Sequence, residues 1–310
     1  MSAKDHNAII LVGGPGQSML RKASGHPVCL LPIPGKKSLL QSWMDTLKSR
    51  MNVRKACVVT GRSEDVETIN THVRSLTEMQ EIDISIHADR ASHRGTAGAL
   101  KDFVESRDDF DDVIMIEGNR IPPEYPEKLL CDEFQSNEVM GILGKSSQDE
   151  TAGMILMKRR MLDLVPDLGF FDFKEQLIPR VIDSGSKIVV KEITRRSVRL
   201  STPSTYLKQL TEFATAESCE GMGPFVSQSA HVDPGSVLGK NVIVGDNVTI
   251  MGGCLIQDSV ILEGSVIESD STLVRSIISR NSRIEEGTSS IIDPYNLDTA
   301  RTEVLKRRIV

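Results

Sequence analysis

A glycine-rich turn follows the first apolar run of the chain. Ala8–Val12 is apolar throughout and leads directly into Gly13-Gly14-Pro15-Gly16. A short continuous apolar run predicts a buried strand, and glycines after a strand let backbone N–H groups approach a phosphate closely. The spacing fits neither of two common phosphate fingerprints, because Met19 replaces the third glycine of a dinucleotide motif and Leu30 the first glycine of a Walker A motif. Taken alone, the turn is as consistent with a purely structural turn as with a phosphate site.

The cysteines and histidines form no motif for a metal ion or a nucleophile. The number of cysteines is odd, no two stand in CxxC spacing, and the six histidines include no HExxH pattern. We therefore expect no metal site and no disulfide framework, and a reducing cytoplasm fits this cysteine usage. The cysteines are Cys29, Cys57, Cys131, Cys219 and Cys254.

The bulk composition excludes several classes of protein. The 310 residues include 37 Lys+Arg and 43 Asp+Glu, for a net charge of -6, with 39% hydrophobic residues. These are ordinary values for a folded soluble protein, and the acidic balance argues against a dedicated nucleic-acid binder. No apolar run approaches the roughly 20 residues that cross a bilayer, and the polar start predicts no signal peptide or membrane anchor. The length favours two domains.

Strand-like and helix-like segments alternate through the first 120 residues. Repeated βα units of this kind imply a parallel sheet with helices on both faces. Predicted strands are Ala8–Val12, Ala56–Thr60, Ile82–Ile86 and Val113–Ile116; predicted helices are Lys37–Ser49, Glu67–Leu76 and Gly95–Glu105.

The pattern is weaker after three prolines at 122, 123 and 126. There we predict strands over Gly153–Met157 and Lys187–Ile193, the start of a helix at Met161–Leu164, helices over Phe173–Ile182 and Tyr206–Phe213, and a linker at Ser218–Met222.

A six-residue period begins at Val226. Aliphatic residues stand six apart, and a small or β-branched residue follows each by four positions, which is the signature of a hexapeptide β-helix. Each hexapeptide forms one side of a triangular coil, and we expect three to four coils with the aliphatic residues inside. The heads are Val226, Val232, Leu238, Val244, Ile250, Ile256 and Leu262; the followers are Ala230, Ser236, Val242, Val248, Cys254, Val260 and Val266. After Leu262 the register slips and continues at Ile267, Leu273, Ile278 and Ile284.

The residue before each inward head should point outward, because neighbouring residues on a strand face opposite sides. Several of these residues are apolar: Phe225, Val237, Ile243, Leu255 and Ile261. Phe225, Ile243 and Ile261 stand one coil apart, so they predict an apolar outer face that mediates self-association or docking on a homologous subunit. The alternative is that the first domain or the tail at 293–310 covers this face.

The stretch from Ala8 to Leu40 resembles the opening of the sugar-1-phosphate nucleotidyltransferases, which carry GGxGTRLxPLT followed by PKPLxPVxGKPLL. Here the corresponding residues are Gly13-Gly14-Pro15-Gly16-Gln17-Ser18 and Leu30-Leu31-Pro32-Ile33-Pro34-Gly35-Lys36. Later matches follow in order: Gly95-Thr96-Ala97-Gly98-Ala99-Leu100 is similar to LGTAGAL, Glu117-Gly118-Asn119 to NGD, Ala152-Gly153 to NAGIY, Phe171-Asp172-Phe173 to FDFEEDLLP, and Thr202-Pro203 with Tyr206 to GTPEDY. The resemblance implies an α/β fold: a Rossmann-like mixed sheet over residues 1–215, then a left-handed β-helix over 224–292 and a tail at 293–310.

Four charged groups that the family uses are replaced here. The resemblance implies an arginine on the triphosphate, a lysine on the attacked phosphate and two aspartates that hold Mg²⁺. The aligned positions hold Ser18, Val28, Asn119 and Arg199. Mg²⁺ prefers carboxylate oxygens, so Asn119 is a poor ligand and Arg199 would repel the ion. Two alternatives keep activity open: Arg199 supplies the metal's charge itself, or Glu117 supplies the missing carboxylate.

The same resemblance places a nucleotide over Gly13, Gly14 and Gly16, with Gly95, Thr96 and Ala97 beside the base. Lys36 either faces the same crevice or has a structural role at the next helix. Lys145 has compatible spacing for the family's sugar-phosphate lysine, and an exposed loop lysine is the alternative.

Three functions compete at this point. The first is a nucleotide-binding or nucleotide-sugar-binding relative with lost or weak catalysis, acting as a regulatory or scaffold subunit. The second is an active nucleotidyltransferase, and Mg²⁺ is an expected cofactor only in that case. The third is an acyltransferase of the hexapeptide domain, for which His231 is the sole histidine on that segment. Neither nucleic acid nor a membrane is an expected partner.

Overall fold

The computed structural model describes residues 6–13, 18–76, 82–89, 94–107, 110–216 and 223–291. The chain forms two compact units, and each takes two segments of the sequence. Residues 1–16 and 39–199 make the α/β unit, and residues 17–38 and 200–310 make the repeat unit. The sequence predicts consecutive domains at 1–215 and 224–292. In the structure, residues 17–38 and the last helix before the repeats belong to the same unit as the β-helix. The predicted linker and tail lie outside the described residues.

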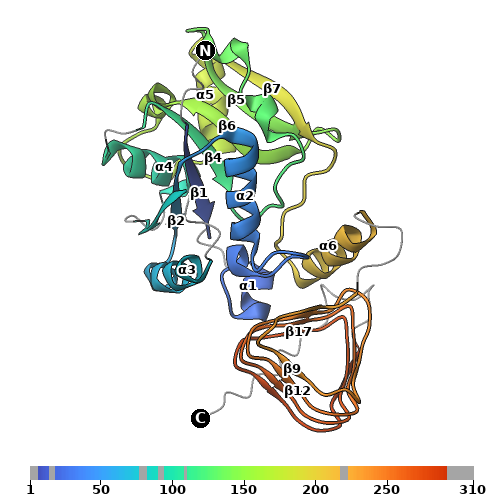
Figure 1. The fold of residues 1–310 in the computed structure, drawn as a ribbon. Coiled ribbons are helices and arrows are strands. Elements are labelled where there is room, and N and C mark those ends of the chain that lie inside the picture. Colours follow the sequence, from blue (N-terminus) through green and yellow to red (C-terminus); the bar gives the residue numbers. More distant parts are fainter. Residues whose placement is uncertain are drawn as a thin grey trace. The chain divides into compact units, whose positions relative to one another are not determined.

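The α/β unit is built on a mixed seven-stranded sheet in the order β3-β2-β1-β4-β6-β5-β7 (Figure 1). β1 to β4 are mutually parallel, as the βα order predicts. β6 runs antiparallel to β4 and β5, whereas β7 is parallel to β5, which confirms the mixed sheet. The strands are β1 Asn7–Val12, β2 Lys55–Thr60, β3 Asp83–Ala88, β4 Asp112–Glu117, β5 Val139–Ser146, β6 Thr151–Lys158 and β7 Lys187–Thr194.

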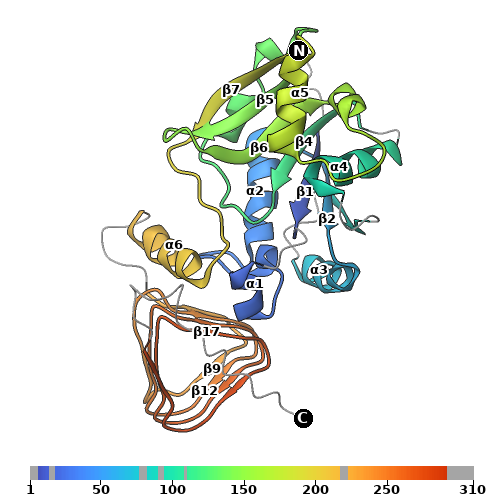
Figure 2. The ribbon, with the colours of Figure 1, turned by 180° about the vertical axis from the view of Figure 1, so that it is seen from behind.

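Helices cover both faces of this sheet. On one face α4 packs with the turns and helix that follow β6 into a core that includes Leu100, Met161 and Val181. Figures 1 and 2 show α2 on the opposite face, where Trp43 and its apolar neighbours on α2 are fully buried. The helices are α2 Leu39–Met51, α3 Ser63–Ser75, α4 Gly95–Glu105 and α5 Ile178–Asp183, with a π-helical turn at Phe173–Leu177 and 3₁₀ turns at Pro126–Leu129, Asp132–Gln135 and Arg159–Leu164.

One strand of the sheet was not predicted. β5 contains Gly141 and Gly144, which interrupt the apolar alternation that marks a strand. The glycines have a packing reason, since a Cβ at Gly144 would fall 3.0 Å from Cγ1 of Ile193 on β7. The structure therefore uses close strand packing where the sequence pattern indicates a break.

The repeat segment forms a left-handed β-helix of three parallel sheets with four strands each, hence four coils. The first sheet contains β8 Phe225–Val226, β11 Ile243–Val244, β14 Val260–Ile261 and β17 Ile277–Ile278. The second contains β9 His231–Val232, β12 Thr249–Ile250, β15 Val266–Ile267 and β18 Arg283–Ile284. The third contains β10 Val237–Leu238, β13 Leu255–Gln257, β16 Thr272–Val274 and β19 Ser289–Ile291.

The register slip lies one position earlier than predicted. Leu238 pairs with Ile256, 18 residues on, but Val244 pairs with Ile261, only 17 residues on. Ile261 is therefore inside the coil and joins its core, while Leu262 is not the inward head. The small corner residues shift as well: buried Ser259 and Ser265 take the places predicted for Val260 and Val266.

The corners of the coils need left-handed backbone. Asn241, Asp258 and Arg275 stack at one corner with φ of 57°, 48° and 52°. Asn and Asp enter this region more readily than other residues with a side chain, and the Asn241 amide donates to Asp258 Oδ1 at 2.8 Å. This ladder fixes the turn of each coil.

The predicted exposed ladder of Phe225, Ile243 and Ile261 is wrong. The true outward column of this sheet is Phe225, Ile243, Val260 and Ile277, and the last three are at most 7% exposed. Helix α1 (Met19–Ser24) of the same unit lies against β17, where the Ser279 hydroxyl donates to the Ala23 carbonyl at 3.1 Å. Helix α6 (Pro203–Ala216) packs beside α1. Val237 and Leu255, neighbours on the third sheet, remain exposed.

No helix in the part of the chain that the structure describes is long and apolar enough to cross a membrane.

Candidate functional site

Three glycines stand just past the ends of three neighbouring parallel strands. Gly13 follows β1 with φ +84°, and the space that a Cβ would take there is open. Gly61 follows β2 and Gly118 follows β4; a Cβ would fall 2.9 Å from the Gly13 carbonyl oxygen in the first case and 2.6 Å from Val12 Cγ1 in the second. Gly61 and Gly118 thus allow close packing between the strand ends, and Gly13 leaves open space beyond the carboxyl end of β1, where ligands of such sheets bind. Gly14 and Gly16 lie outside the described residues.

The predicted base-binding segment is tied to the motif at 171–173. The Thr96 hydroxyl donates to Asp172 Oδ2 and accepts from the Phe173 N–H, both at 3.0 Å. The Ala97 N–H donates to the Phe171 carbonyl at 3.1 Å. Gly95 has φ +73° and lies so close to Phe171 that a Cβ would meet its carbonyl oxygen at 2.6 Å. These contacts join the start of α4 to the π-helical turn, and the nucleotide-binding role of the segment stays a prediction.

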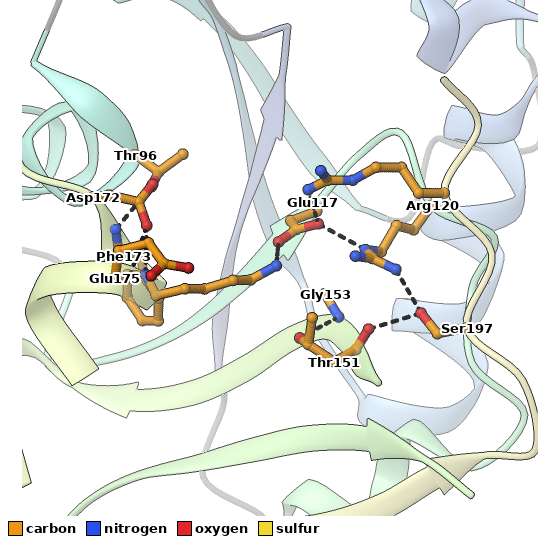
Figure 3. Close-up of polar contacts among 11 residues, drawn as sticks. Thr96, Glu117, Arg120, Thr151, Gly153, Asp172, Phe173, Glu175 and Ser197 are labelled. Atoms are coloured by element: carbon orange, nitrogen blue, oxygen red, sulfur yellow. Dashed lines mark hydrogen bonds and ion pairs between the residues drawn. The ribbon is translucent and has the colours of Figure 1, made fainter. Parts of the chain in front are cut away.

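A largely buried carboxylate at the end of β4 is surrounded by three cations (Figure 3). Glu117 Oε2 accepts from Arg120 Nε at 2.7 Å and from Arg199 Nη2 at 2.6 Å. Glu117 Oε1 forms an ion pair with Lys174 Nζ from the π-helical turn. Both carboxylate oxygens are thus engaged by positive charge. We call Glu117, Arg120, Lys174 and Arg199 the Glu117 cluster.

The electrostatics of the cluster hold Glu117 ionised. Burial alone would raise its pKa, but the charge of Lys174 and the hydrogen bond from Arg120, with further contributions from both, outweigh burial and lower the pKa from 4.5 to about 2. Glu117 is therefore a full negative charge at neutral pH, bound to cations of the chain itself.

Arg120 is held in place from several sides. Its Nη1 donates to the Ser197 hydroxyl at 2.6 Å, and that hydroxyl donates to the Thr151 carbonyl at 2.8 Å. Its own carbonyl accepts from the Trp43 indole at 2.8 Å. Gly153 makes room for it, because a Cβ there would fall 2.7 Å from Arg120 Nε. The Arg120 side chain is only 10% exposed, so it positions Glu117 rather than facing solvent.

This arrangement does not fit Mg²⁺. Among the residues that the structure describes, no group of three or more His, Cys, Asp or Glu side chains could hold a metal ion. Asn119 is half-buried in the turn after β4, and Arg199, at the other predicted metal position, is bound to Glu117. Glu117 would have to give up its cation partners before it could ligate a metal. The first alternative, that Arg199 supplies positive charge directly, matches this geometry better than a carboxylate offered by Glu117.

The other predicted site residues have ordinary local roles. Ser18 caps α1, and its hydroxyl accepts from the Arg21 N–H at 3.2 Å. Val28 begins a 3₁₀ turn, and Lys36 is exposed at a tight turn closed by backbone bonds with Ile33. These three residues belong to the repeat unit.

Lys145, the weak sugar-phosphate candidate, lies near the end of β5 and forms an ion pair with Asp149 in the β5–β6 turn. This pairing resembles the structural alternative more than a binding role.

Three comparisons with known proteins agree on the architecture. A family profile described as the GMPPB C-terminal domain matches residues 223–292. A protein of Sulfolobus acidocaldarius described as a putative mannose-1-phosphate guanyltransferase is 24% identical over 287 residues, covering 82% of this chain and 75% of that protein. The inositol-1-phosphate CTP transferase structure from T. maritima matches with a TM-score of 0.54 at 13% identity, covering 69% of this chain and 98% of that one.

These likenesses confirm the resemblance drawn from the sequence motifs. The chain is nucleotidyltransferase-like and carries a C-terminal repeat domain. They leave open whether transfer occurs, and the Glu117 cluster is the feature of this chain that bears on that question.

Proposed function

We propose that this nucleotidyltransferase-like chain binds a nucleotide or nucleotide sugar and has lost, or kept only weakly, the transfer reaction. Such a protein acts as a regulatory or scaffold subunit. The fold and the open space beside Gly13 at the end of β1 support binding. The Glu117 cluster supports the loss of transfer, because it contains cations of the chain where the resemblance implies carboxylates and a metal.

The observation that carries this proposal is the saturation of Glu117 by Arg120, Lys174 and Arg199. Phosphoryl and nucleotidyl transfer depend on neutralising and aligning phosphate charge. Removing a single electrostatic contact of this kind costs about 10²–10³ in rate. Ser18, Val28, Asn119 and Arg199 together replace four such groups, so little rate enhancement is expected even though the losses are not additive.

An active sugar-1-phosphate nucleotidyltransferase is the second candidate. The relative described as a putative mannose-1-phosphate guanyltransferase favours it. In that case NTP and a sugar 1-phosphate would yield an NDP-sugar and pyrophosphate, and Arg199 would do part of the work of the metal on the phosphates.

Two measurements on the purified chain decide between the candidates. A thermal-shift screen against nucleotides, sugar phosphates and nucleotide sugars detects binding without turnover, since a ligand of the folded state raises the melting temperature. Radiolabelled pyrophosphate exchange with each NTP and hexose 1-phosphate, in Mg²⁺, detects transfer. We expect a thermal shift and no exchange; robust Mg²⁺-dependent exchange would establish the active enzyme instead.

Self-association or docking on a homologous subunit is also part of the proposal. The exposed pair Val237 and Leu255 on the third sheet of the β-helix supports it, whereas Ile243, Val260 and Ile277 on the first sheet are buried. Sedimentation of wild type beside Val237→Ser/Leu255→Ser tests this surface: a dimer that dissociates in the variant supports it, and a monomeric wild type contradicts self-association.

A further inference from the structure

We propose that Lys174 and Arg199 bind the phosphates of the ligand directly and without Mg²⁺, and that Glu117 is their internal counter-ion in the empty protein. This inference rests on the proposed nucleotide-binding function and adds the groups and the metal dependence. It follows from how exposure and charge are distributed within the Glu117 cluster.

Exposure divides the cluster into two pairs. Glu117 and Arg120 are only 13% and 10% exposed, so they form an inner pair with little surface open to a ligand. Lys174 and Arg199 are 32% and 48% exposed, although each also contacts Glu117. A ligand that arrives from solvent therefore meets the two outer cations first.

Charge favours an anion at this position. Three cations face the single carboxylate of Glu117, and Arg120 alone would neutralise it. Asp172, which caps the π-helical turn, accepts hydrogen bonds from the Thr96 hydroxyl and from the N–H groups of Lys174 and Glu175. Asp172 is thus engaged by these donors, and within the Glu117 cluster itself positive charge is in excess.

The geometry of Arg199 suits phosphate. Only its Nη2 is used by Glu117, and its Nε and Nη1 have no partner among the described residues. A guanidinium can present two parallel N–H groups to phosphate oxygens. The Lys174 N–H donates to Asp172, and Asp172 also accepts from the Thr96 hydroxyl. Lys174 in turn contacts Glu117, so these contacts connect the Glu117 cluster to the predicted nucleotide segment (Figure 3).

Isothermal titration of the full chain with inorganic pyrophosphate and with ADP, GDP, CDP, UDP and TDP, each in EDTA and in Mg²⁺, tests the inference. We expect binding in EDTA with an affinity that Mg²⁺ does not increase. Arg199→Gln and Lys174→Gln should each weaken it about ten-fold, the typical effect of removing a charge-assisted hydrogen bond. The matched control is Arg195→Gln, an exposed arginine of the same segment, which should change affinity little.

A Glu117→Gln variant gives an independent arm. Removing the counter-ion frees the outer cations, so a folded Glu117→Gln protein should bind the same probe at least as tightly as wild type. Loss of binding in that variant, with circular dichroism unchanged, would mean that Glu117 holds the ligand or its metal, and it would overturn the inference.

The other outcomes separate the two proposals. If nucleotide binding requires Mg²⁺, the inference of direct phosphate contacts is wrong, but the proposed nucleotide binding stands. The same holds if Arg195→Gln weakens binding as much as Arg199→Gln does. Pyrophosphate binding that no nucleoside diphosphate exceeds supports the cation site and contradicts the proposed function. Absence of binding by every probe overturns both.

Discussion

The Glu117 cluster and the core of the β-helix hold their units together by opposite means. The cluster surrounds one carboxylate at the end of β4 with cations from the turn after β4, the π-helical turn and the segment after β7. The β-helix core stacks aliphatic side chains such as Ile250, Ile256 and Leu273, which are fully buried. The first arrangement is costly to desolvate and sensitive to pH, whereas the second gains stability from apolar burial alone.

The contrast between apolar packing and a charge cluster helps to distinguish structural residues from functional ones. A buried ion pair is weak evidence for stability, because replacing it by apolar groups is often neutral. The cluster lies beyond the strand ends, where ligands of such sheets bind, so its position points to function more than to stability. The perturbations below separate the two regions, beginning with the largest expected effect.

Truncation inside the β-helix should be the most damaging change. Ile256 is fully buried between Leu238 and Leu273, so Ile256→Ala should cost about 2–5 kcal/mol of unfolding free energy. Val237 is 60% exposed on the outer face of the same sheet, and Val237→Ala should cost less than about 0.5 kcal/mol. Urea unfolding of both variants makes the comparison; equal costs would contradict the assigned inward register.

Acid should act on the cluster and not on the β-helix core. The folded pKa of Glu117 is lowered from 4.5 to about 2, so its contribution is present above pH 4.5 and is lost as pH falls toward 2. The shift corresponds to a loss on the order of 3 kcal/mol. Wild type should lose more stability than Glu117→Gln between pH 5 and pH 2, measured by urea unfolding. Parallel loss in the two proteins would show that Glu117 is not held by the cations.

Adding a side chain at Gly153, beside Arg120, should lower the unfolding free energy by a smaller amount. Gly153 combines φ +70° with the close approach of Arg120, so Gly153→Ala should cost roughly 2–3 kcal/mol through backbone strain and displacement of the arginine. Gly185 has φ +80° but open space around it. Gly185→Ala should therefore show only the strain, roughly 1 kcal/mol. Thermal unfolding that gives the same cost for both would remove the packing role assigned to Gly153.

A change at a coil corner should have the smallest effect. Arg275 holds φ +52° in the ladder below Asn241 and Asp258. Asn adopts this conformation more readily than Arg, so Arg275→Asn should stabilise the β-helix by about 0.5 kcal/mol. A small rise in melting temperature by calorimetry would agree with this, and a fall would mean that the contacts of the Arg275 side chain matter more than its backbone.

The two regions also differ in how far the sequence predicts them. The β-helix was predictable because its period repeats along the chain, so each head is recognised from its neighbours. The error at Ile261 came from one residue missing between β13 and β14, which a fixed period of six cannot register. The resemblance of the motifs predicts the mixed sheet. The sequence does not predict β5, because Gly141 and Gly144 interrupt its apolar pattern.

The cluster was only half predictable. Counting back from Thr202-Pro203 locates Arg199, and Glu117 stands out in the sequence as a possible substitute carboxylate. The sequence does not predict the contacts of Arg120 and Lys174 with Glu117. The first depends on the conformation of the turn after β4, and the second joins residues more than 50 positions apart. Lys174 directly after Phe171-Asp172-Phe173 was the available signal, but no sequence period links it to β4.

The carboxyl carbon of Glu117, followed by ¹³C NMR through a pH titration with and without Mg²⁺, tests the central claim most directly. The Glu117→Gln variant assigns the resonance. The cation-bound carboxylate should titrate with a pKa of about 2, and millimolar Mg²⁺ should leave the resonance and its pKa unchanged at neutral pH. A pKa near 4.5, or a resonance that shifts and saturates as Mg²⁺ is added, would show that Glu117 is free for a metal and would contradict the account.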